Sequence, residues 1–275
     1  MALQHREETY EEALRLRREG YTLRQISEHL KVPLGTIHSW IYYDVKPWAV
    51  TPSYEPSPEL AYVVGALSSD GSLFSKGRYH RISLYSKDLD FIREFERCIR
   101  LLTGRKAPLP IYRRKDGSFV TWCSSKRFIK WWIEEEEERL RAVEKYPASF
   151  LRGFADGEGS VSKRLYRISI SNTNYDLVEL CRKALDSLGI RYHVHYRKQK
   201  NPRWKPLWTI YTADIPSLIK WYCFVGFTIK RKREALERLV KKALNAIYDA
   251  RFGFGRKYLL MGVPSPYVWS RGLVR

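Results

Sequence analysis

Two acidic side chains, Asp70 and Glu158, close two copies of one short pattern. Residues 61–72 read AYVVGALSSDGS and residues 149–160 read SFLRGFADGEGS; in each copy an apolar run ends at an acid followed by Gly–Ser. Such a run predicts a helix, and the C-terminal end of a helix carries partial negative charge. Two carboxylates delivered by two such ends repel each other unless a cation lies between them. The pattern therefore predicts a site for a hard divalent cation with oxygen ligands, Mg²⁺ being the first expectation.

The glycine inside each run, Gly65 or Gly153, indicates how the two acids could meet. Glycine has no side chain, so two helix backbones can approach each other closely at such a position. One acid-tipped helix in each copy suggests pseudo-twofold symmetry, with both helices at the axis. A metal between two carboxylates and a DNA phosphate can activate water and stabilise the leaving oxygen. An acid and a glycine after one helix are a common turn, but two copies in register with a downstream repeat favour the chemical interpretation.

The sequence after each acid also repeats, and it predicts the elements that hold the pair. GSLFSKGRYHRISLYSKDLD after the first acid lines up with GSVSKRLYRISISNTNYDL after the second. Each copy continues with a helix, a strand pair and an aromatic helix (FIKWW or LIKWY), and Asp116–Gly117 is a strong hairpin signal in the first copy. We therefore predict an α+β fold with two αββαββα halves, residues 59–145 and residues 146–245.

Polar side chains alternate with apolar ones along the predicted strands. In the first copy, for example, Ile82 and Leu84 face away from the polar residues. Strand faces rich in Arg, Ser and His can contact phosphates and base edges, whereas a plain solvent-facing sheet is the alternative. His193 and His195 could also ligate a metal, although a polar strand face is the commoner reason for their spacing. The strand residues predicted to contact DNA are Arg81, Ser83, Tyr85, Arg167, Ser169, Ser171, Arg191, His193, His195 and Arg197.

Three short helices are predicted ahead of the repeat, within residues 1–43. Thr22, with Gln25 three residues later, forms a capping-box pattern. The stretch REGYTLRQISEHLKVPLGTIHSWI resembles a helix-turn-helix in its spacing of core residues and turn. That resemblance points Ile37 and Ile41 inward and implies DNA contacts from the recognition helix. The residues expected on its exposed side are Gly35, Thr36, His38 and Ser39, the last three being the predicted DNA contacts.

The flanking segments and the composition add broader expectations. A small helical bundle that only packs on the main domain is the alternative for residues 1–43. We predict a proline-rich linker over residues 44–58 and a basic, aromatic C-terminal segment over residues 246–275. The chain of 275 residues carries a formal net charge of +20, which attracts polyanions, above all nucleic acid.

The N-terminal sequence and the spacing of the cysteines indicate the cellular compartment. The charged start MALQHREETYEEA is unlike a signal peptide, and the longest apolar run is too short to span a bilayer. The four cysteines are scattered without a CxxC pair, which disfavours a disulfide or zinc framework. We expect a cytoplasmic, nucleoid-associated or organellar protein.

The two acid-tipped patterns resemble the motifs of the LAGLIDADG homing endonucleases, LRGFADGEG closely and VVGALSSDG more loosely. In that family the eighth motif residue, here Asp70 and Glu158, ligates the metal. The sixth is generally structural; the second copy keeps Asp156 there and the first has Ser68. The resemblance implies Mg²⁺, with Mn²⁺ able to substitute, at a site that includes Asp70, Glu158, Gly71 and Gly159. It also implies a single-chain monomer whose two sheets form a saddle over double-stranded DNA and whose cuts leave short 3′ overhangs.

The same resemblance draws attention to two lysines. Lys87 ends the strand that follows the first motif, and Lys126 begins the last helix of the first half. A lysine near the scissile phosphate could orient water or offset charge in the transition state, although a phosphate contact alone is the alternative. The second copy has Asn172–Thr173 and the region near Asp214 at these places, without lysine. The two cleavage centres are therefore expected to be unequal.

Together these features predict a site-specific, metal-dependent DNA endonuclease encoded within an intron or intein-like element. A non-cleaving DNA-binding transcriptional regulator on the same scaffold is the rival, and retention of both acids argues against it. An RNA-splicing maturase is a third possibility, since it would use the basic surface without needing the acids.

Overall fold

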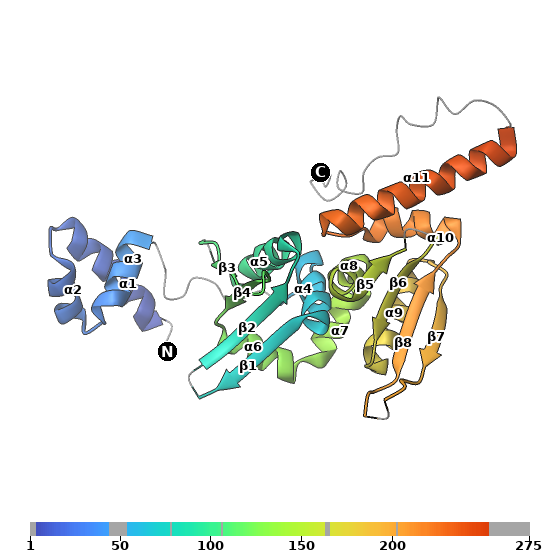
Figure 1. Cartoon of the computed structure of the whole chain (residues 1–275). Coiled ribbons are helices and arrows are strands. Elements are labelled where there is room, and N and C mark those ends of the chain that lie inside the picture. Colours follow the sequence, from blue (N-terminus) through green and yellow to red (C-terminus); the bar gives the residue numbers. More distant parts are fainter. Residues whose placement is uncertain are drawn as a thin grey trace. The chain divides into compact units, whose positions relative to one another are not determined.

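The computed structural model describes residues 4–43, 54–77, 79–105, 107–162, 166–201 and 203–252. The chain divides into an N-terminal helical unit and a larger compact unit (Figure 1). Most of the predicted linker, residues 44–53, and most of the predicted C-terminal segment, residues 253–275, lie outside the described residues. Within the part of the chain that the structure describes, no helix combines the length and apolar character needed to cross a membrane.

Three helices form the N-terminal unit: α1 (Gln4–Arg18), α2 (Leu23–Leu30) and α3 (Leu34–Tyr43). The predicted capping box is present, because the Thr22 hydroxyl accepts a hydrogen bond from the Gln25 backbone and the Gln25 side chain accepts one from Thr22 N–H (2.9 Å). Ile37 is fully buried and Ile41 packs at the edge of the same small core. The core of this unit is built from Tyr10, Ala13, Leu16, Ile26, Ile37 and Trp40.

The larger unit contains the predicted repeat. The first half consists of α4 (Pro58–Ser69), β1 (Gly71–Lys76), β2 (Tyr79–Ser86), α5 (Leu89–Thr103), β3 (Ile111–Arg113), β4 (Phe119–Cys123) and α6 (Lys126–Glu134). The second consists of α8 (Pro147–Glu158), β5 (Gly159–Val161), β6 (Ile168–Asn172), α9 (Tyr175–Ser187), β7 (His193–Arg197), β8 (Leu207–Thr212) and α10 (Ile215–Lys220). The α+β fold with two αββαββα halves is therefore confirmed.

Each half folds its four strands into one antiparallel sheet of the same topology. The orders are β1-β2-β4-β3 and β5-β6-β8-β7, and α4 and α8 lie between the two sheets (Figure 1). Alternation along the strands buries one face: Ile82 and Leu84 are fully covered in the first sheet, and Ile168 and Ile170 nearly so in the second. The other face of each sheet carries the polar residues of the predicted interface.

Two helices outside the repeat connect and extend the halves. α7 (Glu136–Lys145) joins them, and a π-helical turn, Trp221–Val225, leads to the long α11 (Lys230–Phe252). α11 continues past residue 245, where the sequence suggested the end of the second half. The hydrophobic cores also cross over: Ala61 and Val64 of α4 pack in the core of the second half, and Ile229 packs in that of the first. The halves are therefore interdependent.

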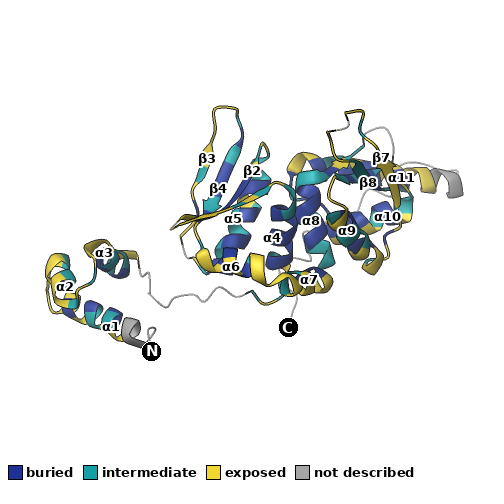
Figure 2. Cartoon of the chain, turned by 90° about the horizontal axis from the view of Figure 1, so that it is seen from below, coloured by how far each residue is buried: buried dark blue, intermediate teal, exposed yellow. Residues whose placement is uncertain are grey.

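The close approach of α4 and α8 confirms the prediction from the two glycines. A Cβ atom on Gly65 would lie 2.2 Å from the Phe150 carbonyl oxygen, and one on Gly153 would lie 2.2 Å from that of Tyr62. No side chain fits at either position, so the backbones touch directly. Figure 2 shows these two helices as the most buried part of the molecule. Their contact fixes where their acidic ends emerge.

Candidate active site and nucleic-acid interface

The two predicted acids lie at the same end of the α4–α8 pair. Asp70 follows α4 directly, and its N–H donates to the Ala66 carbonyl (3.2 Å), while Glu158 is the last residue of α8. A Cβ atom on Gly157 would lie 3.1 Å from Asp70 Oδ2, so the Asp70 carboxylate rests against the last turn of α8. The helix packing therefore brings Asp70 next to the segment that carries Glu158.

The glycine after each acid allows the strand to start at once. A Cβ atom on Gly71 would lie 2.4 Å from Leu67 Cα, and one on Gly159 would lie 2.4 Å from the Ala155 carbonyl oxygen. Any larger residue would push the strand away from the helix it follows. Both glycines therefore hold the acids at the junction of helix and sheet, and their backbone carbonyls are the predicted additional metal ligands.

Electrostatic repulsion between the acids is evident in their pKa values. Burial raises the pKa of Asp70, with Lys232 opposing and Asp88 adding to the rise. Burial also raises the pKa of Glu158, and the negative charge of Asp70 raises it further. The negative charge of Asp70 thus acts on Glu158, and a divalent cation beside both acids would relieve the repulsion and the desolvation.

The donor set fits a hard cation. Two carboxylates at two helix C-termini are oxygen ligands of the kind that Mg²⁺ prefers, and Mg²⁺ usually keeps further positions for water or substrate phosphate. Among the described residues no group of three or more His, Cys, Asp and Glu side chains is gathered to hold a metal ion. The candidate side-chain metal ligands in the described part of the chain are therefore the acid pair alone. Among the described residues, no third His, Cys, Asp or Glu side chain joins His193 and His195 to form an alternative metal site.

Asn172 is a partner of Glu158 that the sequence did not reveal. Its Nδ2 donates to Glu158 Oε1 (3.0 Å) from the last position of β6. In the first half Ser86 occupies the end of β2, and its hydroxyl instead accepts from Asp88 N–H (3.1 Å). The repeat alignment had matched these strand ends without indicating that one of them orients an acid. The two acids therefore have different neighbours.

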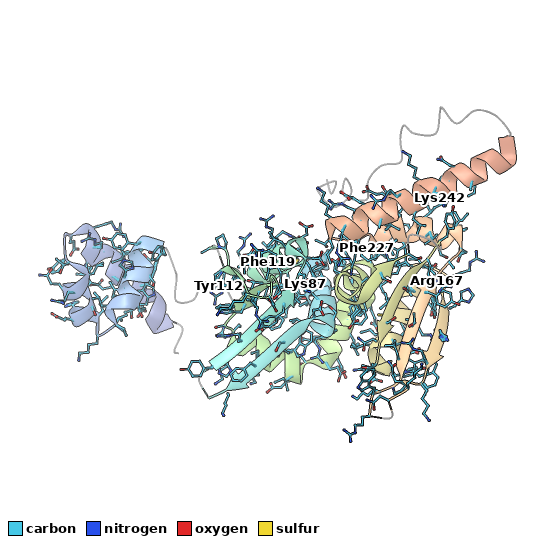
Figure 3. The ribbon with its side chains drawn as sticks, in the orientation of Figure 1. Lys87, Tyr112, Phe119, Arg167, Phe227 and Lys242 are labelled. Carbon is cyan, nitrogen blue, oxygen red and sulfur yellow. The ribbon has the colours of Figure 1, made fainter. Side chains whose placement is uncertain are left out.

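The two candidate lysines occupy different surroundings. Lys87 follows the end of β2 and is labelled in Figure 3. The neighbouring Asp88 raises the pKa of Asp70, so this loop approaches the acid pair. Lys126 begins α6 and lines a hollow of about 620 Å³ over the first sheet. Of the two, Lys87 has the closer link to the acids.

A third lysine, Lys232, and the buried Asp156 were not predicted to interact. Lys232 is only 6% exposed, and its Nζ donates to the carbonyls of Ala155 (2.9 Å) and Asp156 (2.6 Å). The Asp156 carboxylate accepts from Tyr62 Oη (2.9 Å) and Thr228 N–H (3.0 Å). Its structural role at the sixth motif position was expected. Nothing in the run Lys230–Arg233 distinguishes Lys232 from its neighbours by sequence.

The polar face of the first sheet is more aromatic than expected. The Arg81 guanidinium lies over the Trp122 ring (4.9 Å to the centroid), and Trp122 stacks on Tyr112 (4.5 Å). Tyr85 is exposed, but Ser83 is only 3% exposed, and its hydroxyl lies 3.4 Å from the Ser72 carbonyl. Ser83 lies between two neighbouring strands and still lines the hollow over this face, together with Arg81 and Tyr85.

The second sheet presents small polar groups and histidines. Ser169 and Ser171 hydroxyls are 2.9 Å from those of Ser160 and Thr209, respectively. Cross-strand register puts His193 opposite Tyr211 and His195 opposite Thr209. These residues share one exposed or half-exposed face with Arg197. The face is thus suited to hydrogen bonding.

Two arginines predicted on these strands lie outside them. β6 begins at Ile168, so Arg167 precedes it, and its guanidinium stacks over Tyr211 (4.0 Å; labelled in Figure 3). β7 begins at His193, so the prediction that Arg191 shares the strand is wrong. Arg191 instead pairs with Asp214 Oδ1 (3.2 Å), the N-cap of α10. Salt-bridge formation there explains why Arg191 is turned toward α10.

The predicted recognition helix presents an uncharged surface. Thr36, His38 and Ser39 are partly exposed on α3; the His38 ring lies 4.9 Å from that of Tyr42, and the Ser39 hydroxyl donates to the Gly35 carbonyl (2.8 Å). Residues 1–43 contain equal numbers of acidic and basic side chains. The excess positive charge of the chain therefore belongs to the rest of it.

Comparisons with known proteins agree with the motifs and the fold. The chain is 27% identical to an uncharacterized protein of Methanocaldococcus jannaschii over 82% of this chain and 90% of that protein. It is 34% identical to a second one over 54% and 61%, respectively. Shorter matches cover 18% of a glutamine–fructose-6-phosphate aminotransferase of the same organism and 11% of a probable translation initiation factor IF-2 of Thermococcus kodakarensis.

The fold is that of a homing endonuclease. The crystal structure of I-DmoI in complex with DNA and Ca is similar with a TM-score of 0.52 at 21% identity, over 66% of this chain and 97% of that one. The structure of I-DmoI with DNA and Mn gives a TM-score of 0.50 at 21% identity, over 61% and 96%. Residues 145–239 match the family model of the LAGLIDADG-like domain. The second half of the chain thus contains a LAGLIDADG-like domain, and the first half repeats its motif and its order of helices and strands.

Proposed function

We propose that the protein is a site-specific, metal-dependent DNA endonuclease that cuts both strands. The observation that carries this proposal is the convergence of Asp70 and Glu158 where two tightly packed helices end. Each acid belongs to a different half, so each strand of a duplex centred on the pseudo-twofold axis would meet its own acid. The finer outcome, short 3′ overhangs, follows from the family resemblance.

Different residues of the chain would bind the DNA, hold the metal and orient the acids. The polar faces of both sheets would contact the major groove, with Arg81 and Arg197 among the cations that meet phosphates. Asp70 and Glu158 would hold a divalent cation, which supplies a polarised water and charge neutralisation at the scissile phosphate. Lys87 would offset charge there, and Asn172 would keep Glu158 oriented. The loss of a lysine in the second half supports unequal centres.

Divalent cations and duplex DNA are supported by the structural relatives. I-DmoI structures have been determined with DNA in the presence of Mn, Ca or Mg. Mg²⁺, with Mn²⁺ as a substitute, is therefore the proposed cofactor of this chain. Because one chain supplies both acids, it would act as a monomer on double-stranded DNA.

Homing is supported by the pattern of the sequence matches. An aminotransferase and an initiation factor have unrelated activities by name, yet each shares a short part of its length with this chain. Such a pattern is expected when related mobile elements lie inside different host proteins. We propose that this chain is a member of such a group, encoded in an intron or intein-like element.

The decisive experiment neutralises each acid without changing its size. Asp70→Asn and Glu158→Gln should each reduce Mg²⁺-dependent cleavage of a cognate duplex by at least about 100-fold, because a neutral amide is a much weaker Mg²⁺ ligand. Binding of the same duplex in Ca²⁺ or EDTA should hold or tighten, since a negative charge facing phosphate is removed. Lys241→Met, at an exposed position of α11, is the control for surface changes.

Three results would overturn the proposal. Full cutting by both variants would remove the acid pair from the mechanism. Tight, specific binding with no metal-dependent cutting by the wild-type protein would favour the non-cleaving regulator, and specific binding of a structured RNA instead would favour the maturase.

A further inference from the structure

Lys232 is a buried cation at the centre of the molecule that the cleavage chemistry does not use. It is 6% exposed, lies in the first turn of α11 and reaches the last turn of α8. Lysines are almost never this buried unless they are paired with oppositely charged or polar groups. What its ammonium group faces therefore explains why a charge is kept there.

The ammonium group lies against the negative end of α8. Its Nζ donates to the carbonyls of Ala155 (2.9 Å) and Asp156 (2.6 Å), in the turn that ends at Glu158. Carbonyls of a last helical turn lack partners within the helix and carry its partial negative charge. Lys232 therefore gives a donor to the Asp156 carbonyl and a second donor to the Ala155 carbonyl, which also accepts from Gly159 N–H.

The same last turn is where both acids gather. Asp70 Oδ2 lies 3.1 Å from the position of a Cβ atom on Gly157, and Glu158 is the next residue. The positive charge of Lys232 opposes the rise in the pKa of Asp70, and it opposes that of Glu158 as well. One cation thus acts on Asp70 and Glu158, which come from different halves, and also on the buried Asp156 carboxylate, its strongest charge partner.

The first half has no matching arrangement at the end of α4. There the Ala66 carbonyl accepts from Asp70 N–H (3.2 Å) and from the Ser69 hydroxyl (3.0 Å). The counter-charge comes to both acids from α11, which follows the second half. α11 lies outside the repeat, yet its Lys232 contributes to the region between the two halves where both acids lie.

We propose that Lys232 is a built-in counter-cation that holds Asp70 and Glu158 together before any metal binds. Two carboxylates at two helix ends would otherwise drive α4 and α8 apart in the metal-free protein. The ammonium group is a positioning element, because its hydrogen bonds go to the carbonyls of the last turn of α8. The inference depends on the proposed function only in treating the acids as a metal centre.

The test is a stability cycle without metal or DNA. Thermal unfolding in EDTA would be measured for the wild type, Lys232→Met, Asp70→Asn/Glu158→Gln, and the triple variant. Lys232→Met should lower the melting temperature by roughly 5 °C or more in the wild-type background. The loss should be less than half as large when the acids are already neutral, because no repulsion remains to be offset. Lys232→Arg, which keeps the charge, should recover part of the loss.

A matched control separates charge from position. Lys241→Met removes a lysine from an exposed site about 13 Å farther along α11, at 1.5 Å per residue, and should change the melting temperature equally little in both backgrounds. A second readout is Ca²⁺ affinity, followed by the rise in melting temperature: Lys232→Met should bind Ca²⁺ at least about threefold more tightly, since the site becomes more negative.

Equal losses of melting temperature in both acid backgrounds would overturn the proposal and leave Lys232 as a cap of the α8 carbonyls only. If Lys232→Met fails to fold with the acids intact but folds in the acid-neutral background, the proposal is supported; failure in both backgrounds counts as equal loss. None of these readouts requires cleavage. An inactive protein could therefore pass this test, and an active endonuclease could fail it.

Discussion

At the scale of single residues, the two motifs differ most at their sixth position. Asp156 in the second motif is 2% exposed and receives hydrogen bonds from Tyr62 of α4 and from the backbone of Thr228, just before α11. Ser68 in the first motif is only half-buried. Asp156 therefore ties three helices together at one point, whereas Ser68 belongs to one helix.

Removal of this carboxylate should be costly. Asp156→Ala leaves Tyr62 and the Thr228 N–H without acceptors in the interior and should lower the free energy of unfolding by about 2–4 kcal/mol. Ser68→Ala is the matched change in the other motif and should cost less than about 1 kcal/mol. Urea denaturation of both variants gives the comparison. Equal losses would mean that the interior network contributes nothing of its own.

The same residue gives a pH dependence. Burial raises the pKa of Asp156 to about 6, while the unfolded chain would titrate near 4. The folded state holds this proton more tightly, so the group's contribution to stability is complete below about pH 4 and is lost as pH rises through about 6. The side chain in Asp156→Asn does not titrate. Between pH 4.5 and pH 7 the free energy of unfolding of this variant should therefore rise by roughly 1–3 kcal/mol relative to that of the wild type. A difference in unfolding free energy that stays flat over this range would contradict the assignment.

Single residues also show which parts of the candidate site could be predicted from the sequence. Asp70 and Glu158 were predictable because a repeated motif gives each acid a partner copy to be aligned with. Asn172 and Lys232 were not, because their roles come from packing between segments far apart in the chain. Lys232 follows two exposed basic residues, Lys230 and Arg231, and only its position in the first turn of α11 aims it at α8.

At the scale of elements, the contact between α4 and α8 depends on two residues without side chains. Gly65→Ala and Gly153→Ala each place a Cβ atom 2.2 Å from a carbonyl oxygen of the other helix. The helices would have to separate, so each variant should lose at least about 3 kcal/mol of stability and most of its cleavage activity. Gly35→Ala in α3 meets no atom within 4 Å and is the control; it should be neutral or slightly stabilising. Wild-type melting temperatures for the first two variants would refute the packing.

The order of elements followed from the repeat, but their ends did not. Hydrophobic alternation predicted the strands of both sheets, and their register placed the polar residues on one face as expected. Arg191 was assigned to a strand because it continues the alternation of His193 and His195. Its ion pair with Asp214, at the start of a helix more distant in sequence, takes it off the strand. Partners of this kind are set by tertiary structure and leave no local signal.

At the scale of the whole molecule, the excess positive charge lies outside the N-terminal unit. The net charge of +20 resides outside residues 1–43, whose acidic and basic side chains balance. The larger unit would therefore supply most of the phosphate contacts. The helix-turn-helix resemblance of the N-terminal unit remains a prediction, and its candidate contacts, Thr36, His38 and Ser39, include no lysine or arginine. That unit would act through base edges and through its tether.

This separation predicts how salt should affect two forms of the protein. For the full chain, the logarithm of the binding constant should fall with the logarithm of salt concentration, by about 0.9 per neutralised phosphate. Deleting residues 1–53 should weaken binding of the cognate duplex at least about tenfold and shorten the footprint, because a tethered contact is lost, yet change the slope by less than about one phosphate. Metal-dependent cutting should survive, since Asp70 and Glu158 belong to the larger unit.

The measurement is fluorescence anisotropy across a salt series, combined with footprinting of both forms. His38→Ala in the full chain is a milder variant for the same comparison. An unchanged footprint and affinity would show that the N-terminal helices do not touch DNA, whereas a much shallower slope would show that they carry the electrostatic contact after all.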